Sequence, residues 1–483
     1  MNRPDREAPR EHAGRRRARP APAGGLCAGF GAAPFGDWSG YLLPGHAARN
    51  RPADGVLNTL WVRAAAFRGH DRTVVLILAE VLAIDRELEC EIVAAVTDTL
   101  LAGFGAAGAP IPHSTSASGK GPPRAAPPPG DPLLAPPTSG LDVLVCATHT
   151  HTGPPVFSLG EAEAVGPARA ELTDLAARAA ERALQNARPV TRIGFRIAHN
   201  SYAVNRRLQT EHGVQMAPNP GGPVGPSVAL VSFYGKPDHN GAPADAARAE
   251  DRPIGRIAVL PMHPTVLSPQ IAQLSGDVAG VFGAALEEAG DVPCLVLQGA
   301  SGNVRPNLVD AEGAFRGGEV RELIAMGRDL ANRLIEAEER GVTRGGDICF
   351  TFASSEVELS LAPVEDKHSP PPPPAAESLL GRRVSMLAFD EALALVLLPG
   401  EPFVELAWAI RNSVRETTDC EVLVAGHAGA TVGYVATAEA ADLGGYEPAE
   451  AYRYYGFSRP LARECGEELV TAAARLLRDT VVS

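Results

Sequence analysis

Apolar segments of strand length alternate with longer helix-like segments along nearly the whole of the 483-residue chain. Alternation of this kind predicts an α/β layered sandwich, with a mixed, largely buried sheet and helices on its faces. We expect residues 201–207 to form a polar loop. The predicted strands span residues 26–31, 57–67, 73–79, 141–147, 191–199, 228–234, 253–262, 293–298, 394–398 and 421–425, and the predicted helices span residues 80–101, 161–187, 277–289, 318–340, 402–417 and 461–479.

Three stretches have a composition that cannot bury a core. Residues 1–25 are rich in Arg, Pro and Ala and lack the apolar region of a signal peptide, so we expect a disordered tail. Residues 103–140 are almost wholly Gly, Ala, Pro and Ser, and residues 363–378 contain a proline run. We therefore predict a single domain over residues 26–483, with flexible surface insertions at 103–140 and 363–378.

Charge and cysteine content narrow the class of partner. The net charge of −13 argues against nucleic acid as the main partner, because phosphate binding needs a basic face. The seven cysteines form no close pair, which favours a reducing compartment over a disulfide framework. No run of 18 apolar residues exists, so we expect no transmembrane segment and a cytoplasmic protein. The oligomeric state stays open.

Two histidines follow the predicted strand 141–147, in the segment Thr148-His149-Thr150-His151-Thr152-Gly153-Pro154. Alternate residues at a strand end point the same way, so His149 and His151 can present their imidazoles to one pocket. Two neutral imidazoles beyond a strand's carboxyl end are typical of a transition-metal site in an α/β protein. The alternative is a pair of polar loop histidines.

Three further polar residues also follow apolar segments. His263 stands where strand 253–262 meets Pro264, Glu401 follows Pro399-Gly400, and Tyr434 follows another strand and turn. Strand ends of an α/β sheet share one rim, and two histidines, a glutamate and a tyrosine are a ligand set suited to zinc. Each also has an ordinary explanation: a core histidine, a carboxylate at a helix N-terminus, and a half-buried packing tyrosine.

Several short motifs occur in a fixed order along the chain: Ala147-Thr148-His149-Thr150-His151-Thr152-Gly153-Pro154, Asn205-Arg206, Pro253-Ile254-Gly255, His263-Pro264-Thr265, Ser275-Gly276-Asp277, Pro399-Gly400-Glu401, Tyr434-Val435-Ala436-Thr437 and Tyr446-Glu447. In this order they resemble the amino-terminal catalytic domain of the neutral/alkaline (non-lysosomal) ceramidases. The resemblance covers most of residues 26–460 and is specific as a set.

This resemblance implies a zinc-dependent amidohydrolase of sphingolipid and lipid metabolism, in which zinc-bound water attacks an amide carbonyl. It implies zinc (Zn²⁺) held by His149, His263, Glu401 and Tyr434. It also implies a substrate pocket lined by His151, Arg206 and Tyr446, which would orient the substrate and stabilise the oxyanion. A positioned arginine or imidazole supplies a few kcal/mol in a dry site, and amide cleavage also needs an acid for the leaving amine.

The sequence departs from the family in two places. The family's Gly-Asp-Val-Ser-Pro-Asn is replaced by Gly302-Asn303-Val304-Arg305-Pro306-Asn307, so a serine nucleophile is absent there. We therefore place Asn303 and Arg305 among the candidate substrate-binding residues; Arg305 is either an anion-binding residue or a surface salt-bridge partner. We also expect no carboxy-terminal immunoglobulin-like domain, which makes ceramide in a bilayer a doubtful substrate.

Three hypotheses follow. The first is a ceramidase-like zinc hydrolase (an N-acylsphingosine amidohydrolase type) cleaving an N-acyl amide of a small-molecule or lipid-like substrate. The second applies the same metal site to a different amide or to an ester. The third is a non-catalytic binding protein on a ceramidase scaffold, suggested by Asn303 and Arg305. Retention of all four candidate ligands favours the hydrolase, because a binding protein has no need of an open zinc site.

Overall fold

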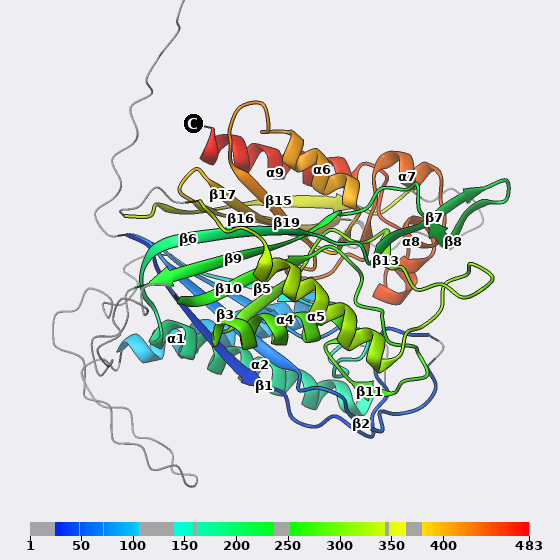
Figure 1. The fold of residues 1–483 in the computed structure, drawn as a ribbon, viewed down its shortest axis with the longest axis horizontal. Helices are drawn as coiled ribbons and strands as arrows, with labels where there is room; N and C mark the ends of the chain where they lie inside the picture. The colour runs from blue at the N-terminus through cyan, green and yellow to red at the C-terminus, as the bar shows by residue number, and fades with distance from the viewer. Residues whose placement is uncertain are drawn as a thin grey trace, which may run out of the picture.

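The computed structural model describes residues 25–47, 49–70, 72–105, 140–157, 162–235, 252–342, 347–363 and 379–482. The predicted tail and both predicted insertions lie almost entirely outside these ranges. Two sheets lie face to face in the described part, and helices cover their outer faces, which gives four layers (Figure 1). The predicted α/β sandwich is confirmed.

The larger sheet is mixed and runs in the spatial order β12-β10-β9-β6-β1-β3-β4-β5. Strands β4 and β5 pair in parallel, as do β10 and β12, whereas the other neighbours in this order are antiparallel. The bounds are β12 (Cys294–Gln298), β10 (Pro253–Leu260), β9 (Ser227–Gly235), β6 (Arg188–His199), β1 (Cys27–Pro34), β3 (Trp61–Arg68), β4 (Thr73–Ala79) and β5 (Leu141–Ala147), with the short β14 (Arg340–Gly341) paired to β6.

Helices cover the outer face of this sheet in two pairs. Helices α1 (Arg86–Gly105) and α2 (Ala162–Gln185) pack on the half that contains β1, β3, β4 and β5. Helices α4 (Asp277–Gly290) and α5 (Val320–Glu336) pack on the half that contains β6, β9, β10 and β12. Strand β4 is buried along its whole length because both of its faces are covered, which explains its continuous apolar sequence.

The second sheet has the order β15-β16-β17-β19, with bounds β15 (Phe350–Ser360), β16 (Leu379–Phe389), β17 (Leu393–Leu397) and β19 (Glu421–Ala425). Helices α6 (Val404–Asn412) and α9 (Cys465–Val481) cover its outer face. Its inner face contributes Leu387, Phe389 and Leu395 to a core shared with the larger sheet. This core fixes the position of one sheet against the other.

Three small ladders lie between or beside the layers. They comprise β2 (Gly55–Val56) with β11 (Gln273–Leu274), β13 (Val304–Pro306) with β7 (Ala203–Thr210) and β8 (Gly213–Asn219), and β18 (Glu401–Pro402) with β20 (Tyr434–Val435). The short helices α7 (Ala438–Asp442), α8 (Tyr446–Ala449) and η3 (Ala451–Tyr455) follow β20. These short elements carry several of the predicted site residues.

The strands that precede His149 and His263, β5 and β10, stand near opposite ends of the strand order. Curling of the sheet brings β12 into contact with β3, β4 and β5. The segment that follows β19 then links both ends, because Ala425 bridges to Gly299 after β12 and Ala428 bridges to Cys146 in β5. The shared rim predicted from the sequence therefore forms by curling rather than by strands lying next to one another.

Some predicted elements differ from those observed. Residues 203–210 form β7 instead of a polar loop, because β13 and β8 satisfy its backbone hydrogen bonds from either side. Strands β15 and β16 were not predicted, since the outward side chains of β15 are polar and no continuous apolar run marks it. Helix α6 ends at Asn412, five residues before the predicted end.

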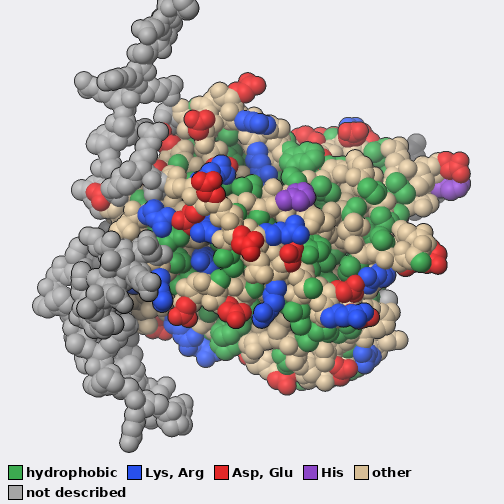
Figure 2. Space-filling view, in the orientation of Figure 1, with side chains coloured by type: hydrophobic (Ala, Val, Ile, Leu, Met, Phe, Trp, Pro, Cys, Tyr) green, Lys and Arg blue, Asp and Glu red, His purple; other side chains and the backbone are tan. Residues whose placement is uncertain are grey.

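Two surface properties bear on the predicted partners. Among the described residues, no helix has both the length and the apolarity that crossing a membrane requires. On the face drawn in Figure 2, acidic and basic side chains are interspersed, and the basic ones do not gather into one continuous patch.

Candidate metal centre

His149 is held in place by the end of β5. Its backbone has a positive φ of 65°, a conformation that a non-glycine residue adopts only when its surroundings enforce it. Here the His149 amide donates to the carbonyl of Val81, and the ring Nδ1 lies 2.8 Å from the carbonyl oxygen of Leu82. Because a carbonyl only accepts, Nδ1 carries a proton, and Nε2 faces the interior.

His151 is oriented in the same way by a different loop. Its Nδ1 lies 2.7 Å from the carbonyl oxygen of Gly45, and its Nε2 lies 3.3 Å from Nε2 of His149. Gly45 has a φ of 106°, and a Cβ on it would lie 2.7–2.8 Å from the His151 ring. Glycine is therefore required at position 45, both for its backbone conformation and for the space taken by the imidazole.

His263 reaches the same point from the end of β10. Its Nε2 lies 3.1 Å from Nε2 of His149, and its backbone amide donates to the carbonyl of Val304 in β13. Burial lowers the pKa of His263 well below its ordinary value, with the nearby charge of Arg206 adding to the effect. The His263 ring is thus neutral, and its buried Nδ1 has no hydrogen-bond partner.

Glu401 supplies an oxygen donor. Its Oε2 lies 3.2 Å from Nε2 of His149 and 3.6 Å from Nε2 of His263, and the Tyr455 hydroxyl donates to its Oε1. Burial alone would raise the pKa of this carboxyl, but the facing His149, with His427 and Tyr455, lowers it to about 2. Glu401 is therefore an anion aimed at the histidines.

His427 joins this cluster, although the sequence reasoning overlooked it. Its ring stacks on that of His149 with centroids 4.2 Å apart, and the two histidines with Glu401 form one candidate metal-holding group. A second such group consists of His149, His151 and His263. The signal was present, since Gly426-His427 follows the strand that ends at Ala425, as His149 follows β5.

Tyr434, Tyr446 and Arg206 form the next ring of side chains. Tyr434 pairs in register with Glu401 across β18 and β20, and its ring lies 6.4 Å from that of His263. The Tyr446 ring lies 5.9 Å from the Tyr434 ring, and the Arg206 guanidinium lies 5.3 Å from the Tyr434 ring centroid. All of the predicted metal and catalytic residues are thus brought into one neighbourhood.

Arg206 is fixed by partners behind it. Its Nε donates to Glu447 at 2.8 Å and its Nη2 donates to the carbonyl of Gly302 at 2.7 Å. Arg207 donates to the other carboxylate oxygen of Glu447 at 2.7 Å, so this buried acid is paired on both sides. Two bound edges leave the Arg206 side chain little freedom to rotate away from Tyr434.

The two predicted substrate-binding residues differ in whether their side chains are hydrogen-bonded. The Asn303 amide donates to Glu405 at 2.7 Å, and its oxygen accepts from the Val404 backbone at 3.1 Å, so Asn303 anchors the start of α6. Arg305, two residues further along, stacks on Phe315 with its guanidinium 4.3 Å from the ring centroid. Its buried Nε has no hydrogen-bond partner.

The donor arrangement fits a transition metal. Imidazole nitrogens about 2.0–2.1 Å from a tetrahedral zinc lie about 3.3 Å from one another, close to the separations of 3.1 and 3.3 Å between the Nε2 atoms here. Metal-binding histidines also characteristically donate their other N–H to a backbone carbonyl, as His149 and His151 do. In their neutral forms, His149 and His151 would turn their Nε2 lone pairs toward each other, because each Nδ1 proton points at a carbonyl, and a cation between them would relieve that repulsion.

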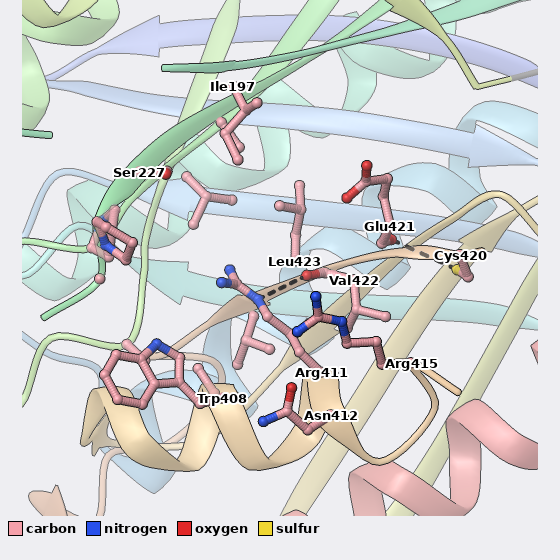
Figure 3. Close-up of a pocket in the computed structure, with 18 of the residues that line it drawn as sticks. Ile197, Ser227, Trp408, Arg411, Asn412, Arg415, Cys420, Glu421, Val422 and Leu423 are labelled. Carbon is pink, nitrogen blue, oxygen red and sulfur yellow. Dashed lines mark hydrogen bonds between the residues drawn. The ribbon is translucent and has the colours of Figure 1, made fainter. Parts of the chain in front are cut away.

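The molecule also has a groove that lies away from the metal centre. A groove of about 630 Å³ runs between β6 and β9 on one side and α6 with β19 on the other. Figure 3 shows Trp408, Arg411 and Arg415 on its helical side, with Ile197 and Ser227 opposite them. None of the histidines or Glu401 lines this groove.

No family model matches the chain, and no curated protein matches it in sequence. Solved structures do match it. The neutral ceramidase from Pseudomonas aeruginosa aligns with a TM-score of 0.62 at 16% identity, over 95% of this chain and 76% of that one. A ceramidase complexed with C2 aligns with a TM-score of 0.64 at 18% identity and the same coverage. The chain therefore has the fold of the neutral ceramidases, and at the level of the fold the resemblance predicted from its motifs is confirmed.

Proposed function

We propose that this protein is a zinc-dependent hydrolase that cleaves an N-acyl amide. The observation that carries the proposal is the convergence of Nε2 of His149, Nε2 of His263 and Oε2 of Glu401 within 3.1–3.6 Å. A buried carboxylate oxygen that has no hydrogen-bond partner among the described residues, set against two buried imidazoles, is expensive unless a cation binds there.

The proposed ligands are His149, His263, Glu401 and Tyr434. The first three supply the converging donor atoms, and the register of β18 with β20 sets Tyr434 beside Glu401. Tyr455 fixes the carboxylate by donating to its other oxygen. Zinc bound by such a set supplies an activated water at neutral pH and polarises a substrate carbonyl.

His151 is the proposed proton carrier. Its Nδ1 proton is committed to Gly45, so its Nε2 is free to accept a proton beside the cluster and to return it to the leaving amine. His151 is only half-buried, whereas His149 and His263 are buried, so it lies on the side from which a substrate arrives. Burial lowers the pKa of His151 well below its ordinary value, which keeps the ring neutral before reaction.

Arg206 and Tyr446 are the proposed oxyanion-stabilising and substrate-orienting residues. Arg206 is held rigidly by Glu447 and Gly302, and a pre-positioned guanidinium stabilises developing negative charge without reorganising. Burial raises the pKa of Tyr446 above its ordinary value, so its phenol keeps its proton and acts as a hydrogen-bond donor.

The amide preference rests on the fold shared with ceramidases, whose name denotes action on ceramide, an N-acyl amide. Ceramide is one candidate within this class, which would connect the protein to sphingolipid metabolism. The same donor set and proton carrier also act on an ester, so ester cleavage is the second candidate reaction at the same site. A metal-free protein without hydrolytic activity would favour the binding-protein hypothesis.

The test combines metal analysis with hydrolysis of fluorogenic N-acyl amides and esters of several chain lengths. We expect one zinc per chain in the purified protein, together with loss of zinc and of activity in His149→Ala. His212→Ala is the matched control, since His212 is exposed on the turn between β7 and β8. Activity in His149→Ala equal to that of wild type would exclude catalysis at this centre.

A further inference from the structure

Arg305 occupies the half-buried side of the metal centre. Strand β13 pairs with β7 so that Arg305 faces Val204, and Arg206 stands two residues further along β7 on the same face. The preceding residue, Val304, accepts the backbone N–H of His263. Arg206 and Arg305 therefore lie on one face of this ladder, and Val304 joins the ladder to His263.

This guanidinium has no counterion in the part of the chain that the structure describes. No Asp or Glu among the described residues pairs with Arg305, and it makes no hydrogen bond with them either, whereas Arg206 is paired with Glu447. Desolvation, with the charge of Arg206 nearby, lowers the pKa of Arg305 to about 10, which still leaves it charged at neutral pH. Stacking on Phe315 fixes the plane of the Arg305 guanidinium and leaves the N–H groups at its edge available to a ligand.

A second arginine, Arg49, lies near the same histidines and is itself buried. Arg49 donates through Nη1 to the carbonyl oxygen of His151 at 2.8 Å, but its buried Nε and Nη2 have no hydrogen-bond partner among the described residues. Desolvation lowers the pKa of His46 to about 4, and the charges of Arg49 and Arg305 add to the effect, so both arginines lie near His46. The His46 ring is 4.9 Å from that of His151, which ties this group to the metal centre.

Positive charges therefore outnumber negative ones around Arg49, Arg305 and the histidines. Glu401 is the acid in contact with the histidines. A bound divalent cation would bring two further positive charges beside those of Arg49 and Arg305. A half-buried guanidinium whose buried Nε lacks a hydrogen-bond partner is unfavourable, and a planar oxyanion at the edge of a stacked guanidinium is the group that pairs with it most strongly.

We infer that the substrate is an N-acyl amide whose amine portion carries an anionic oxygen group, as in an N-acyl amino acid, and that Arg305 binds this group. This inference rests on the proposed function for the identity of the scissile bond. Ceramide has no such charge, so the preferred substrate differs from that of the structural neighbours named above.

The test uses N-octanoylglycine, its nearly isosteric neutral analogue N-octanoylglycinamide, and N-octanoyl-aminomethylphosphonate, which carries a tetrahedral anion in place of the planar one. Affinities for the full chain stripped of metal by a chelator are measured by calorimetry, so that binding is read without hydrolysis. We expect the wild type to bind an anionic probe about 10- to 100-fold more tightly than the neutral one, as for a hydrogen bond to a charged group. The carboxylate and phosphonate arms distinguish which anion the site accepts.

Arg305→Gln should abolish this preference, and Arg305→Lys should keep part of it. Arg321→Gln is the control, since Arg321 is exposed on α5 and should keep the full preference. Thermal unfolding of Arg305→Gln verifies folding, and we expect no loss of stability because an unpaired cation is removed. Equal binding of charged and neutral probes by the wild type, or a preference that survives in Arg305→Gln, would overturn the inference.

The zinc-loaded protein is then assayed for hydrolysis of the same probes. An Arg305-dependent preference in binding without any hydrolysis would support the inference on anion recognition while refuting the proposed hydrolase. Hydrolysis of the glycine and glycinamide probes at equal rates, with equal affinities, would support the hydrolase and refute the role of Arg305.

Discussion

The metal centre and the groove of Figure 3 differ in the way that matters for function. The groove has about 630 Å³ of space, and among the described residues none of its lining side chains has a buried polar atom without a hydrogen-bond partner; Arg411, for example, donates to the carbonyl of Val422. The metal centre is tightly packed, yet Nδ1 of His263 and Oε2 of Glu401 have no hydrogen-bond partner. Because a buried unsatisfied polar atom is unfavourable, its retention marks chemistry more reliably than empty space does.

Metal removal should have the largest effect on activity, and this effect should depend on the metal centre and not on the groove. Dialysis against a chelator should lower amide hydrolysis at least about a thousandfold, because an activated water is lost, and added zinc should restore it. The groove variant Trp408→Ala should lose and regain activity in the same proportion. Activity that is unaffected by complete loss of metal would place catalysis outside this centre.

Tyr455→Phe should produce the next largest effect. It removes the hydroxyl that donates to Glu401 Oε1 while keeping the ring. Groups that orient a metal ligand typically contribute about 10- to 100-fold to metal affinity. Zinc affinity measured by competition with a chromogenic chelator should fall by that factor, whereas Tyr41→Phe, on an exposed side chain, should change nothing. An unchanged affinity in Tyr455→Phe would show that the carboxylate is fixed by other contacts.

Gly45→Ala should have a smaller effect on rate, mediated by His151. The new Cβ would lie 2.7–2.8 Å from the His151 ring and must displace it, so we expect kcat to fall about tenfold. Gly40→Ala is a close control, because Gly40 also has a positive φ (92°) but a Cβ added to it would meet no heavy atom within 4 Å. Both variants should lose similar stability from backbone strain, about 1–3 kcal/mol, and only Gly45→Ala should lose kcat.

Trp408→Ala should have the smallest effect. Trp408 is 36% exposed, so its removal leaves the core and the metal centre intact. We expect kcat/KM to remain within about twofold of wild type and the melting temperature to change little. A large rise in KM for long-chain amides would instead show that the groove takes part in substrate binding, and the contrast drawn between the two regions would be wrong.

The sequence indicated many of the elements because their apolar runs are continuous. Strands β4 and β5 match their predicted bounds, since both are buried between layers. Strands β7 and β15 were missed because neither is apolar throughout; β7 forms only when β8 and β13 pair with it. Local pattern finds strands buried on both faces and overlooks those that depend on distant partners.

The sequence by itself determined the chemistry: the types of donor atom, their places after apolar strands, and an arginine at position 305. Only the tertiary structure decided which donors meet. Sheet curling sets β5 beside β12, the segment after β19 adds His427, and Tyr455 arrives from η3 to hold Glu401. The physical reason is that side-chain identity is local, whereas convergence depends on long-range packing and on hydrogen bonds between segments that are far apart in the chain.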